Sequence, residues 1–91
     1  MIGKGFKLID GKEERLVQDV CIEKRQYGRC HLTFLFRDNS LKKIAIDEAD
    51  KFELFCKHLN KGEIESCHMF SLDVCWTTNS GKLFGMNYSP N

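Results

Sequence analysis

Two alternating stretches decide the fold: CHLTFLF at residues 30–36 and LKKIAI at residues 41–46. In both, large apolar residues such as Phe34 and Ile44 fall on even positions. A period of two is typical of a strand that buries one face. The two stretches therefore predict a hairpin with one apolar side.

A loop of three residues, 38–40, is predicted to join these strands, because this length brings the two apolar faces together. It pairs Arg37 with Leu41 and places Phe34 opposite Ile44. A two-residue loop would slip the register by one position and turn one apolar face to water.

A helix is predicted directly after the hairpin. Asp47 is the expected N-cap, since its carboxylate can accept from the first free amides. Gly62 provides a stop, because glycine readily takes the left-handed conformation after a helix. Between them runs one apolar stripe at helical spacing, which needs a sheet to cover. The stripe consists of Ala49, Phe52, Phe55, Cys56 and Leu59.

Residues 13–26 fit two structures. Their apolar residues can form a helical stripe, but Leu16, Val20 and Ile22 also share the parity of a strand. We favour the strand, because a three-residue loop at 26–28 would align its apolar face with that of the next strand. The pairs expected from this register are Ile22 with Leu32, Val20 with Phe34, Gln18 with Phe36 and, on the outer face, Glu23 with His31 and Cys21 with Thr33.

The two ends of the chain follow the same pattern. Residues 3–9 predict a short strand with Phe6 and Leu8 on one side, and Asp10-Gly11 is a turn signal. The last hairpin is predicted around a loop at 79–81, with residues 70–76 as its first strand. Its expected pairs are Trp76 with Phe84, Val74 with Met86 and Leu72 with Tyr88.

The predicted fold class is α+β: an antiparallel sheet or open barrel, β-β-β-β-α-β-β, with one helix packed on its apolar face. We expect a single domain over residues 1–91, with a flexible tail at 89–91. If residues 13–26 were helical, the order would become a ferredoxin-like βαββαβ arrangement.

Composition favours an ordinary folded domain. The apolar fraction is 42%, which argues against disorder. The sequence shows no long apolar run and no secretory leader, so we expect a cytoplasmic protein. The five cysteines are an odd number, and reduced thiols are the expectation.

Charge is distributed unevenly along the chain. Residues 1–46 carry ten Lys and Arg against six Asp and Glu, whereas residues 47–91 carry four against seven. This asymmetry predicts a basic and an acidic pole. The expected contact residues on the outer face of the basic half, or at its loop tip, are Arg25, Tyr27, Arg29, His31, Arg37 and Lys43.

These residues favour a non-catalytic binding module, such as a small inhibitor, adaptor or regulatory subunit, that meets an acidic protein surface. Regulators of this size are common in phages and mobile elements. The alternative is RNA binding through the same face, although the large aromatics fall on the buried parity and could not stack on bases. Two further routes to a partner are free first and last strands, which could form an edge-strand dimer, and the off-parity apolar residues. The latter are Leu35, Leu54, Met69 and Leu83.

Two sets of residues could carry chemistry, and we expect neither to do so. Glu23, His31 and Cys21 resemble parts of a general-base device, but no oxyanion donor accompanies them. A zinc site would need four convergent ligands. The candidates have unsuitable spacings: Cys56, His58, Cys67, His68 and Cys75. No cofactor is expected.

Overall fold

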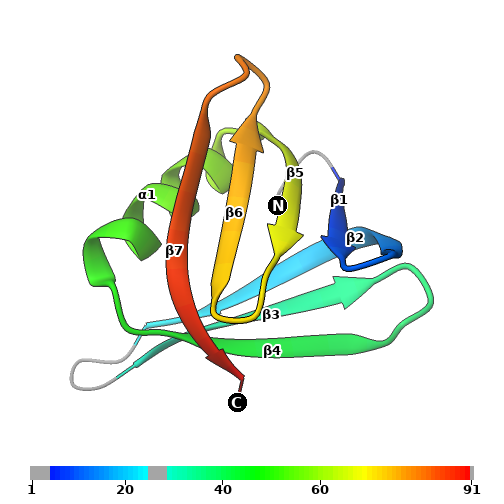
Figure 1. Cartoon of the computed structure of the whole chain (residues 1–91), viewed down its shortest axis with the longest axis horizontal. Helices are drawn as coiled ribbons and strands as arrows, with labels where there is room; N and C mark the ends of the chain where they lie inside the picture. The colour runs from blue at the N-terminus through cyan, green and yellow to red at the C-terminus, as the bar shows by residue number, and fades with distance from the viewer. Residues whose placement is uncertain (1–4, 25–28, 91) are drawn as a thin grey trace.

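The structure is a computed structural model that describes residues 5–24 and 29–90. Its strands form a closed barrel in the order β1-β2-β3-β4-β7-β6-β5. Strands β2, β3 and β4 run across the direction of β5, β6 and β7, and α1 fills the corner between these two groups (Figure 1). The elements are β1 (Phe6–Asp10), β2 (Glu13–Glu23), β3 (Cys30–Phe36), β4 (Leu41–Ile46), α1 (Ala49–Asn60), β5 (Ile64–Met69), β6 (Asp73–Thr78) and β7 (Leu83–Pro90).

The predicted class, a sheet with one helix on its apolar side, describes this architecture in outline. The described residues contain one strand more than predicted, and the barrel is closed. Residues 13–23 form β2. The helical alternative for this segment is therefore wrong, and with it the ferredoxin-like arrangement. The pairs confirmed between β2 and β3 are Val20 with Phe34, Cys21 with Thr33, Ile22 with Leu32 and Glu23 with His31.

A bulge between Val17 and Asp19 corrects the remaining β2 pair. Val17, not Gln18, lies opposite Phe36. The extra residue reverses the parity of the strand, so Val17 is buried and Leu16 faces water. Asp19 accepts a hydrogen bond from the next backbone N–H at 2.8 Å, which helps to satisfy the backbone beside the bulge.

Strands β3 and β4 are joined by three residues, as predicted, but the loop is 37–39, one position earlier. Asn39 takes a left-handed φ of 69° at the third loop position, a conformation that asparagine tolerates better than most residues. The register moves by two, so Ile44 lies opposite Leu32 and not Phe34. A shift of two keeps every side chain on its face.

Strand β5 is missing from the predicted order, which treats residues 70–76 as one strand. In the structure, Phe70 and Leu72 belong to the turn between β5 and β6 and are exposed. β5 contains a bulge between Ile64 and Ser66. Its buried residues therefore do not share one parity, since Ile64 is at an even position and Met69 at an odd one, and the alternation rule does not detect the strand.

The β6–β7 hairpin is confirmed. Its loop is 79–81, and Gly81 takes a φ of 86° at the third loop position. The predicted partners Trp76 with Phe84 and Val74 with Met86 lie opposite one another, and the Tyr88 amide donates to the Leu72 carbonyl at 2.9 Å.

The first and last strands each have two neighbours, so the prediction of free edges is wrong. β1 pairs antiparallel with β2 and parallel with β5, while β7 pairs with β6 and, near its end, with β4. β7 includes part of the expected tail: Ser89 lies opposite Ala45 and Pro90 opposite Ile44. On the β4 side, the strand pairing of β7 is limited to residues 88–90.

Helix α1 starts differently from the prediction. Its N-cap is Glu48, which makes no side-chain cap hydrogen bond. Asp47, the predicted N-cap, instead pairs with Arg29, with 3.1 Å between Nε and Oδ1. The Glu48 carboxylate accepts from the Asn87 amide at 2.8 Å and so ties the helix start to β7.

The helix ends as predicted. Gly62 takes a left-handed φ of 68° and donates to the Leu59 carbonyl, while the Glu63 amide donates to the His58 carbonyl. This is a Schellman motif. The helix buries Phe52, Phe55, Cys56 and Leu59, whereas Ala49 is exposed.

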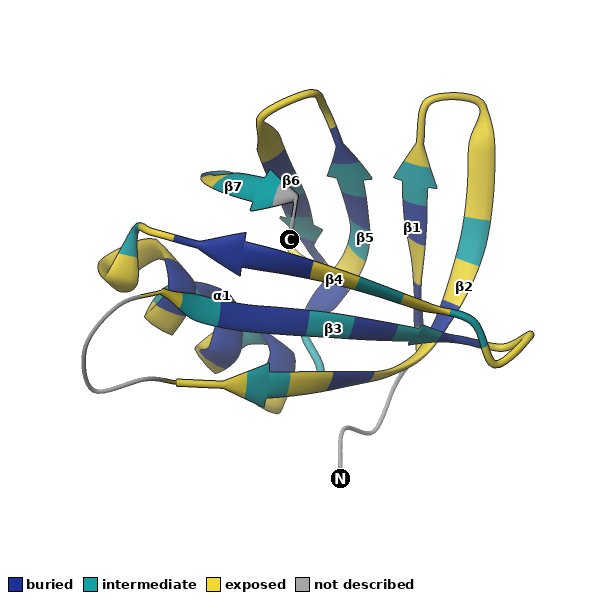
Figure 2. Ribbon diagram, turned by 90° about the horizontal axis from the view of Figure 1, so that it is seen from below, coloured by how far each residue is buried: buried dark blue, intermediate teal, exposed yellow. Residues whose placement is uncertain are grey.

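The core lies inside the barrel and under the helix. Figure 2 shows buried positions along β3 and β4 and on one side of α1. Phe55 meets Trp76 edge to face, with 5.1 Å between ring centroids, so the helix is held to β6 by aromatic packing. The largest fully buried side chains are Trp76, Phe34, Phe36, Phe52 and Phe55.

Candidate functional site

The predicted contact face can be followed for four of its six residues. Arg25 and Tyr27 lie outside the described residues. The others belong to β3 and β4 or border them: Arg29, His31, Arg37 and Lys43.

Two of these cations are already matched by carboxylates. Arg29 pairs with Asp47 at 3.1 Å, and Lys43 pairs with Glu23 at 3.5 Å. Both pairs are about half exposed, so each contributes little to stability. Their effect on binding is larger, since each carboxylate cancels much of the field that a phosphate or an acidic partner would meet.

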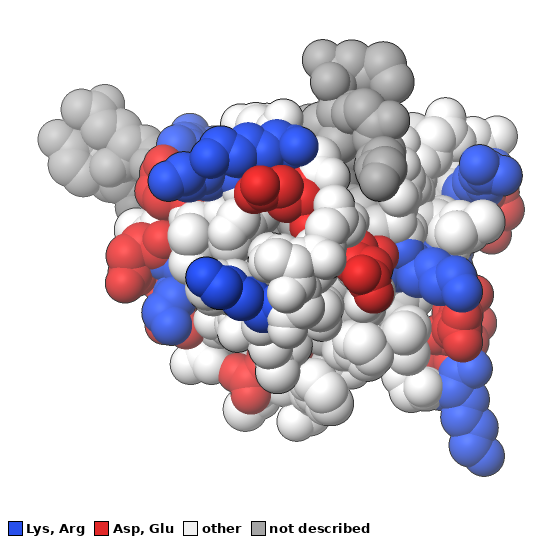
Figure 3. Space-filling model, turned by 90° about the horizontal axis from the view of Figure 1, so that it is seen from above, with Lys and Arg blue, Asp and Glu red and all other residues white. Residues whose placement is uncertain are grey.

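Ion pairs connect the basic half of the sequence, residues 1–46, with the acidic half, residues 47–91. Lys24 pairs with Glu53 of the helix, and this hydrogen bond raises the pKa of Lys24. Figure 3 shows Lys and Arg next to Asp and Glu over one face of the molecule. Arg29 and Asp47 form a second pair between the two halves, so part of the positive charge of residues 1–46 is offset by carboxylates of residues 47–91.

His31 is not the exposed contact residue that the sequence predicts. It lies opposite Glu23 and Ala45 on the outward parity of β3, but it is only 7% exposed. Ala45 is also buried, which shows that this row of the outer face is covered. Nδ1 of His31 has no hydrogen-bond partner within residues 5–24 and 29–90. The burial leaves little of this side chain for a partner to touch.

Arg37 is the predicted contact residue that remains free. It is exposed at the end of β3, and it forms no ion pair with the described residues. Its amide donates to the Leu16 carbonyl at 3.2 Å, so it sits directly beside β2. Arg37 can therefore offer an uncompensated charge to a partner.

A polar clamp holds the hairpin next to Arg37. The Arg15 guanidinium lies 3.7 Å from the centroid of the Phe36 ring and contacts both Asp38 and Ser40. Hydrogen bonds from Ser40, assisted by Arg15, lower the pKa of Asp38. A pocket of about 300 Å³ lies beside this clamp and is also bordered by Leu16 and Arg37.

Three leucines gather on the outer face of β2–β4, and we call them the leucine patch: Leu16, Leu35 and Leu41. Leu35 and Leu41 are direct cross-strand partners. Leu16 lies opposite Arg37, whose amide donates to the Leu16 carbonyl. Because Arg37 is two residues beyond Leu35 on the same strand, Leu16 is a diagonal neighbour of Leu35. Leu16 and Leu41 are 45% and 65% exposed. The bulge in β2 turns Leu16 outward, so the alternation rule assigns it to the wrong face.

The apolar group predicted from parity does not form one surface. Leu35 joins the leucine patch, but Leu54 packs against the core and Met69 is buried. Leu83 is exposed beside the loop at 79–81, on β7. Only Leu35 of the four contributes to the outer face of β2–β4.

The residues considered for catalysis are separated by their contacts. Glu23 lies opposite His31 as predicted, but its carboxylate pairs with Lys43, and His31 is buried. Cys21 is exposed one row away. No hydrogen bond joins these three side chains within the described part of the chain.

The candidate zinc ligands also lie apart. His58 Nδ1 accepts from Trp76 Nε1 at 2.9 Å, and Cys67 lies opposite Trp76 inside the barrel. His68 and Cys75 are cross-strand partners. Within residues 5–24 and 29–90, no three His, Cys, Asp or Glu side chains are placed to hold a metal ion.

The thiols are unpaired, and two of them, Cys56 and Cys67, are buried. All five cysteines are free. Burial raises the pKa of Cys56, of Cys67 and of Cys75, and the charge of Asp73 adds to the effect at Cys75. Raised values keep these thiols protonated and poorly nucleophilic near neutral pH.

Comparison with known proteins gives no match: no family model fits the chain, and no curated protein and no solved structure is significantly similar to it. Among the described residues, no helix has the length and apolar character needed to cross a membrane. The function is therefore inferred from the surface of this molecule alone.

Proposed function

We propose that this chain is a non-catalytic binding domain, such as a small inhibitor, adaptor or regulatory subunit, that contacts a protein partner through the outer face of β2–β4. The observation that carries the proposal is the leucine patch beside Arg37. Adjacent exposed apolar side chains with a neighbouring arginine are typical of protein interfaces.

The contact surface differs from the basic face that the sequence suggests. Arg29 and Lys43 are matched by carboxylates, so they contribute less to attraction than their number implies. We expect the partner to present apolar groups to the leucines and a carboxylate to Arg37. Five free thiols favour a reducing compartment such as the cytoplasm.

Nucleic acid is the weaker alternative for this face. A backbone of phosphates needs several uncompensated cations in line, and stacking needs exposed aromatics. Within the described part of the face, Arg37 is the unmatched predicted cation, and Phe34 and Phe36 point into the core. Both features favour a protein partner.

The test is a quantitative pull-down from the native host with mass spectrometry, using the intact chain and a Leu16→Asp/Leu41→Asp variant. Placing two charges in an apolar contact is expected to weaken binding of the specific partner by about tenfold or more. The control is Leu72→Asp/Leu83→Asp, which changes two leucines that are at least as exposed as Leu16 and lie away from the patch, and it should leave the partner bound.

Thermal unfolding of both variants checks that they fold. Equal loss of the partner in both variants, or no loss in either, would contradict the assignment of this face. Retention on immobilised RNA that falls steeply with salt and disappears in Arg37→Ala would favour the nucleic-acid alternative instead.

A further inference from the structure

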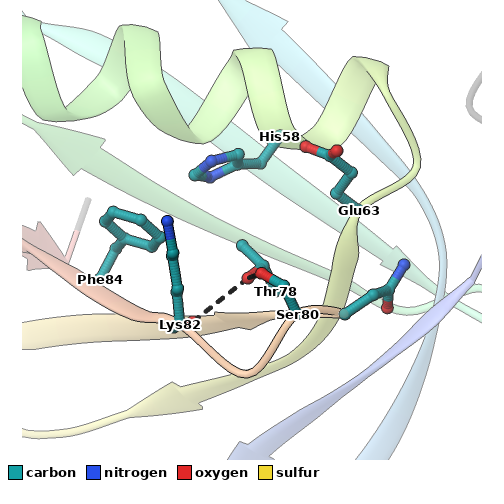
Figure 4. A pocket seen from close by; sticks show the side chains of 7 residues that line it. His58, Glu63, Thr78, Ser80, Lys82 and Phe84 are labelled. Atoms are coloured by element: carbon teal, nitrogen blue, oxygen red, sulfur yellow. Dashed lines mark hydrogen bonds between the residues drawn. The ribbon is translucent and has the colours of Figure 1, made fainter.

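A pocket lies between the end of α1 and the β6–β7 hairpin, and it belongs to none of the surfaces described so far. Its volume is about 520 Å³, within the range of small-molecule sites. Figure 4 shows side chains from the helix above and the hairpin below pointing into it. The side chains that matter for its chemistry are His58, Glu63, Ser80, Lys82 and Phe84.

The walls of this pocket are fixed by backbone structure. The Asn79 amide donates to the Glu63 carbonyl at 2.8 Å, and the Asn79 side chain donates to the Gly62 carbonyl at 3.3 Å. These bonds tie the hairpin to the Schellman turn at the end of α1. The pocket therefore exists before any ligand binds, which reduces the entropic cost of binding.

One wall is aromatic and carries a single oriented donor. Trp76 is fully buried and donates its indole N–H to His58 Nδ1 at 2.9 Å. A nitrogen that accepts carries no hydrogen, so Nε2 of the neutral imidazole holds it. The His58 and Phe84 rings lie 4.9 Å apart between centroids. Together they offer an apolar surface with an N–H donor at its edge.

Two opposite charges border the same space. The Lys82 ammonium and the Glu63 carboxylate lie to either side of His58 in Figure 4. Neither side chain forms an ion pair with the described residues. The pocket is thus dipolar and nearly neutral overall. A phosphate or other dianion would meet the repulsion of Glu63, whereas a ligand with both charges would satisfy both groups.

We propose that this pocket binds a free α-amino acid with an aromatic side chain. Its carboxylate would accept from Lys82 and from Nε2 of His58, its ammonium would donate to Glu63, and its ring would pack against Phe84. This inference goes beyond the proposed function, because it concerns a different surface and a small ligand.

The test is titration of the ¹⁵N-labelled chain, followed by NMR, with phenylalanine and two blocked analogues. N-acetylphenylalanine lacks the ammonium, and phenylalanine amide lacks the carboxylate. We expect saturable shifts around residues 58–63 and 78–84 with phenylalanine. Each analogue should bind about tenfold more weakly, the effect of one charge-assisted hydrogen bond at a half-exposed site.

Two variants assign the charges. Lys82→Met should reduce the preference for phenylalanine over its amide, with His58 Nε2 left as the remaining donor, and Glu63→Gln should remove the preference over the N-acetyl form. The matched controls are Lys61→Met and Glu65→Gln, whose charges lie outside the pocket, and both preferences should persist in them.

Three outcomes would overturn the proposal. The first is the absence of shifts with phenylalanine, tyrosine and tryptophan up to about 10 mM. The second is equal binding of phenylalanine and its blocked analogues, and the third is equally tight binding of inorganic phosphate. None of these outcomes bears on the leucine patch, so the two proposals fail independently.

Discussion

Two hairpins of the barrel use the same loop but are held by different forces. In the loop at 37–39, the Phe36 amide donates to the Ser40 carbonyl and the Asn39 amide donates back to Phe36. In the loop at 79–81, Thr78, Lys82 and Gly81 make the same two bonds. Each loop places its third residue in the left-handed region.

The support around the two loops differs. The first hairpin is clamped from outside by Arg15, which covers Phe36 and contacts Asp38. The second continues into strands whose residues Trp76 and Phe84 stack at 5.7 Å. We infer that the first hairpin depends on charge and solvent conditions, whereas the second depends on buried area.

The largest expected difference is between Trp76→Ala and Arg15→Ala. Removing the buried indole should lower the free energy of unfolding by about 3–5 kcal/mol, whereas removing the partly buried guanidinium of Arg15 should cost only about 1 kcal/mol. Urea unfolding measures both, with Leu83→Ala as a control within about 0.5 kcal/mol. Similar costs for Trp76 and Arg15 would refute the comparison.

A smaller effect is expected from exchanging the left-handed residues. Gly81→Ala should cost about 1–2 kcal/mol, because a β-carbon strains this conformation, although it would meet no neighbouring atom. Asn39→Gly should change stability by no more than about 0.5 kcal/mol, since the strain removed offsets the entropy lost by glycine. A tolerated Gly81→Ala would show that the loop conformation is not what fixes the register.

The smallest expected effect is a pH dependence confined to the first hairpin. Ser40 and Arg15 hold the pKa of Asp38 below its usual range. The stabilisation of the folded hairpin by the Asp38 carboxylate is therefore complete above the pKa of Asp38 in the unfolded chain. It is lost as the pH falls through the lower pKa of Asp38 in the folded state. NMR titration of the Ser40 amide should follow this transition, and Asp38→Asn should abolish it. A Gly81 amide that followed the same transition would contradict the assignment to one hairpin.

The two loops also explain which parts of the fold could be predicted. A glycine at position 81 indicates a left-handed conformation there, and the register of the β6–β7 hairpin agrees with the prediction. Asn39 signals the same conformation more weakly, because Asp38 and Ser40 are also common in turns. The predicted loop is consequently one position late. The predicted core residues of β3 and β4 are unaffected, since a register shift of two residues keeps each side chain on the same face of the sheet.

Bulges account for the more serious differences. β3 is unbroken, and so are β6 and β7, and alternation identifies their inner faces. β2 and β5 each contain an extra residue that reverses the parity, and there the rule assigns Leu16 to the core and misses β5 altogether. A bulge depends on long-range pairing, which no local pattern in the sequence reports.

The candidate sites were accessible to sequence reasoning only in part. Arg37 could be predicted, because its parity places it outside. The leucine patch depends on the β2 bulge, and the pocket depends on a helix end meeting a distant hairpin. The bond between His58 and Trp76 could not be foreseen, because the spacing of these two residues carries no motif.

The parallel seam between β1 and β5 has a consequence for how the chain matures. Lys7 pairs with Ser66, so the intervening strands and the helix must be looped out before the seam can form. Contacts of such long range are assembled late and slowly. We therefore expect that β1 has only β2 as a neighbour until β5 has been synthesised, and that the apolar side chain of Leu8 can be bound by chaperones until then.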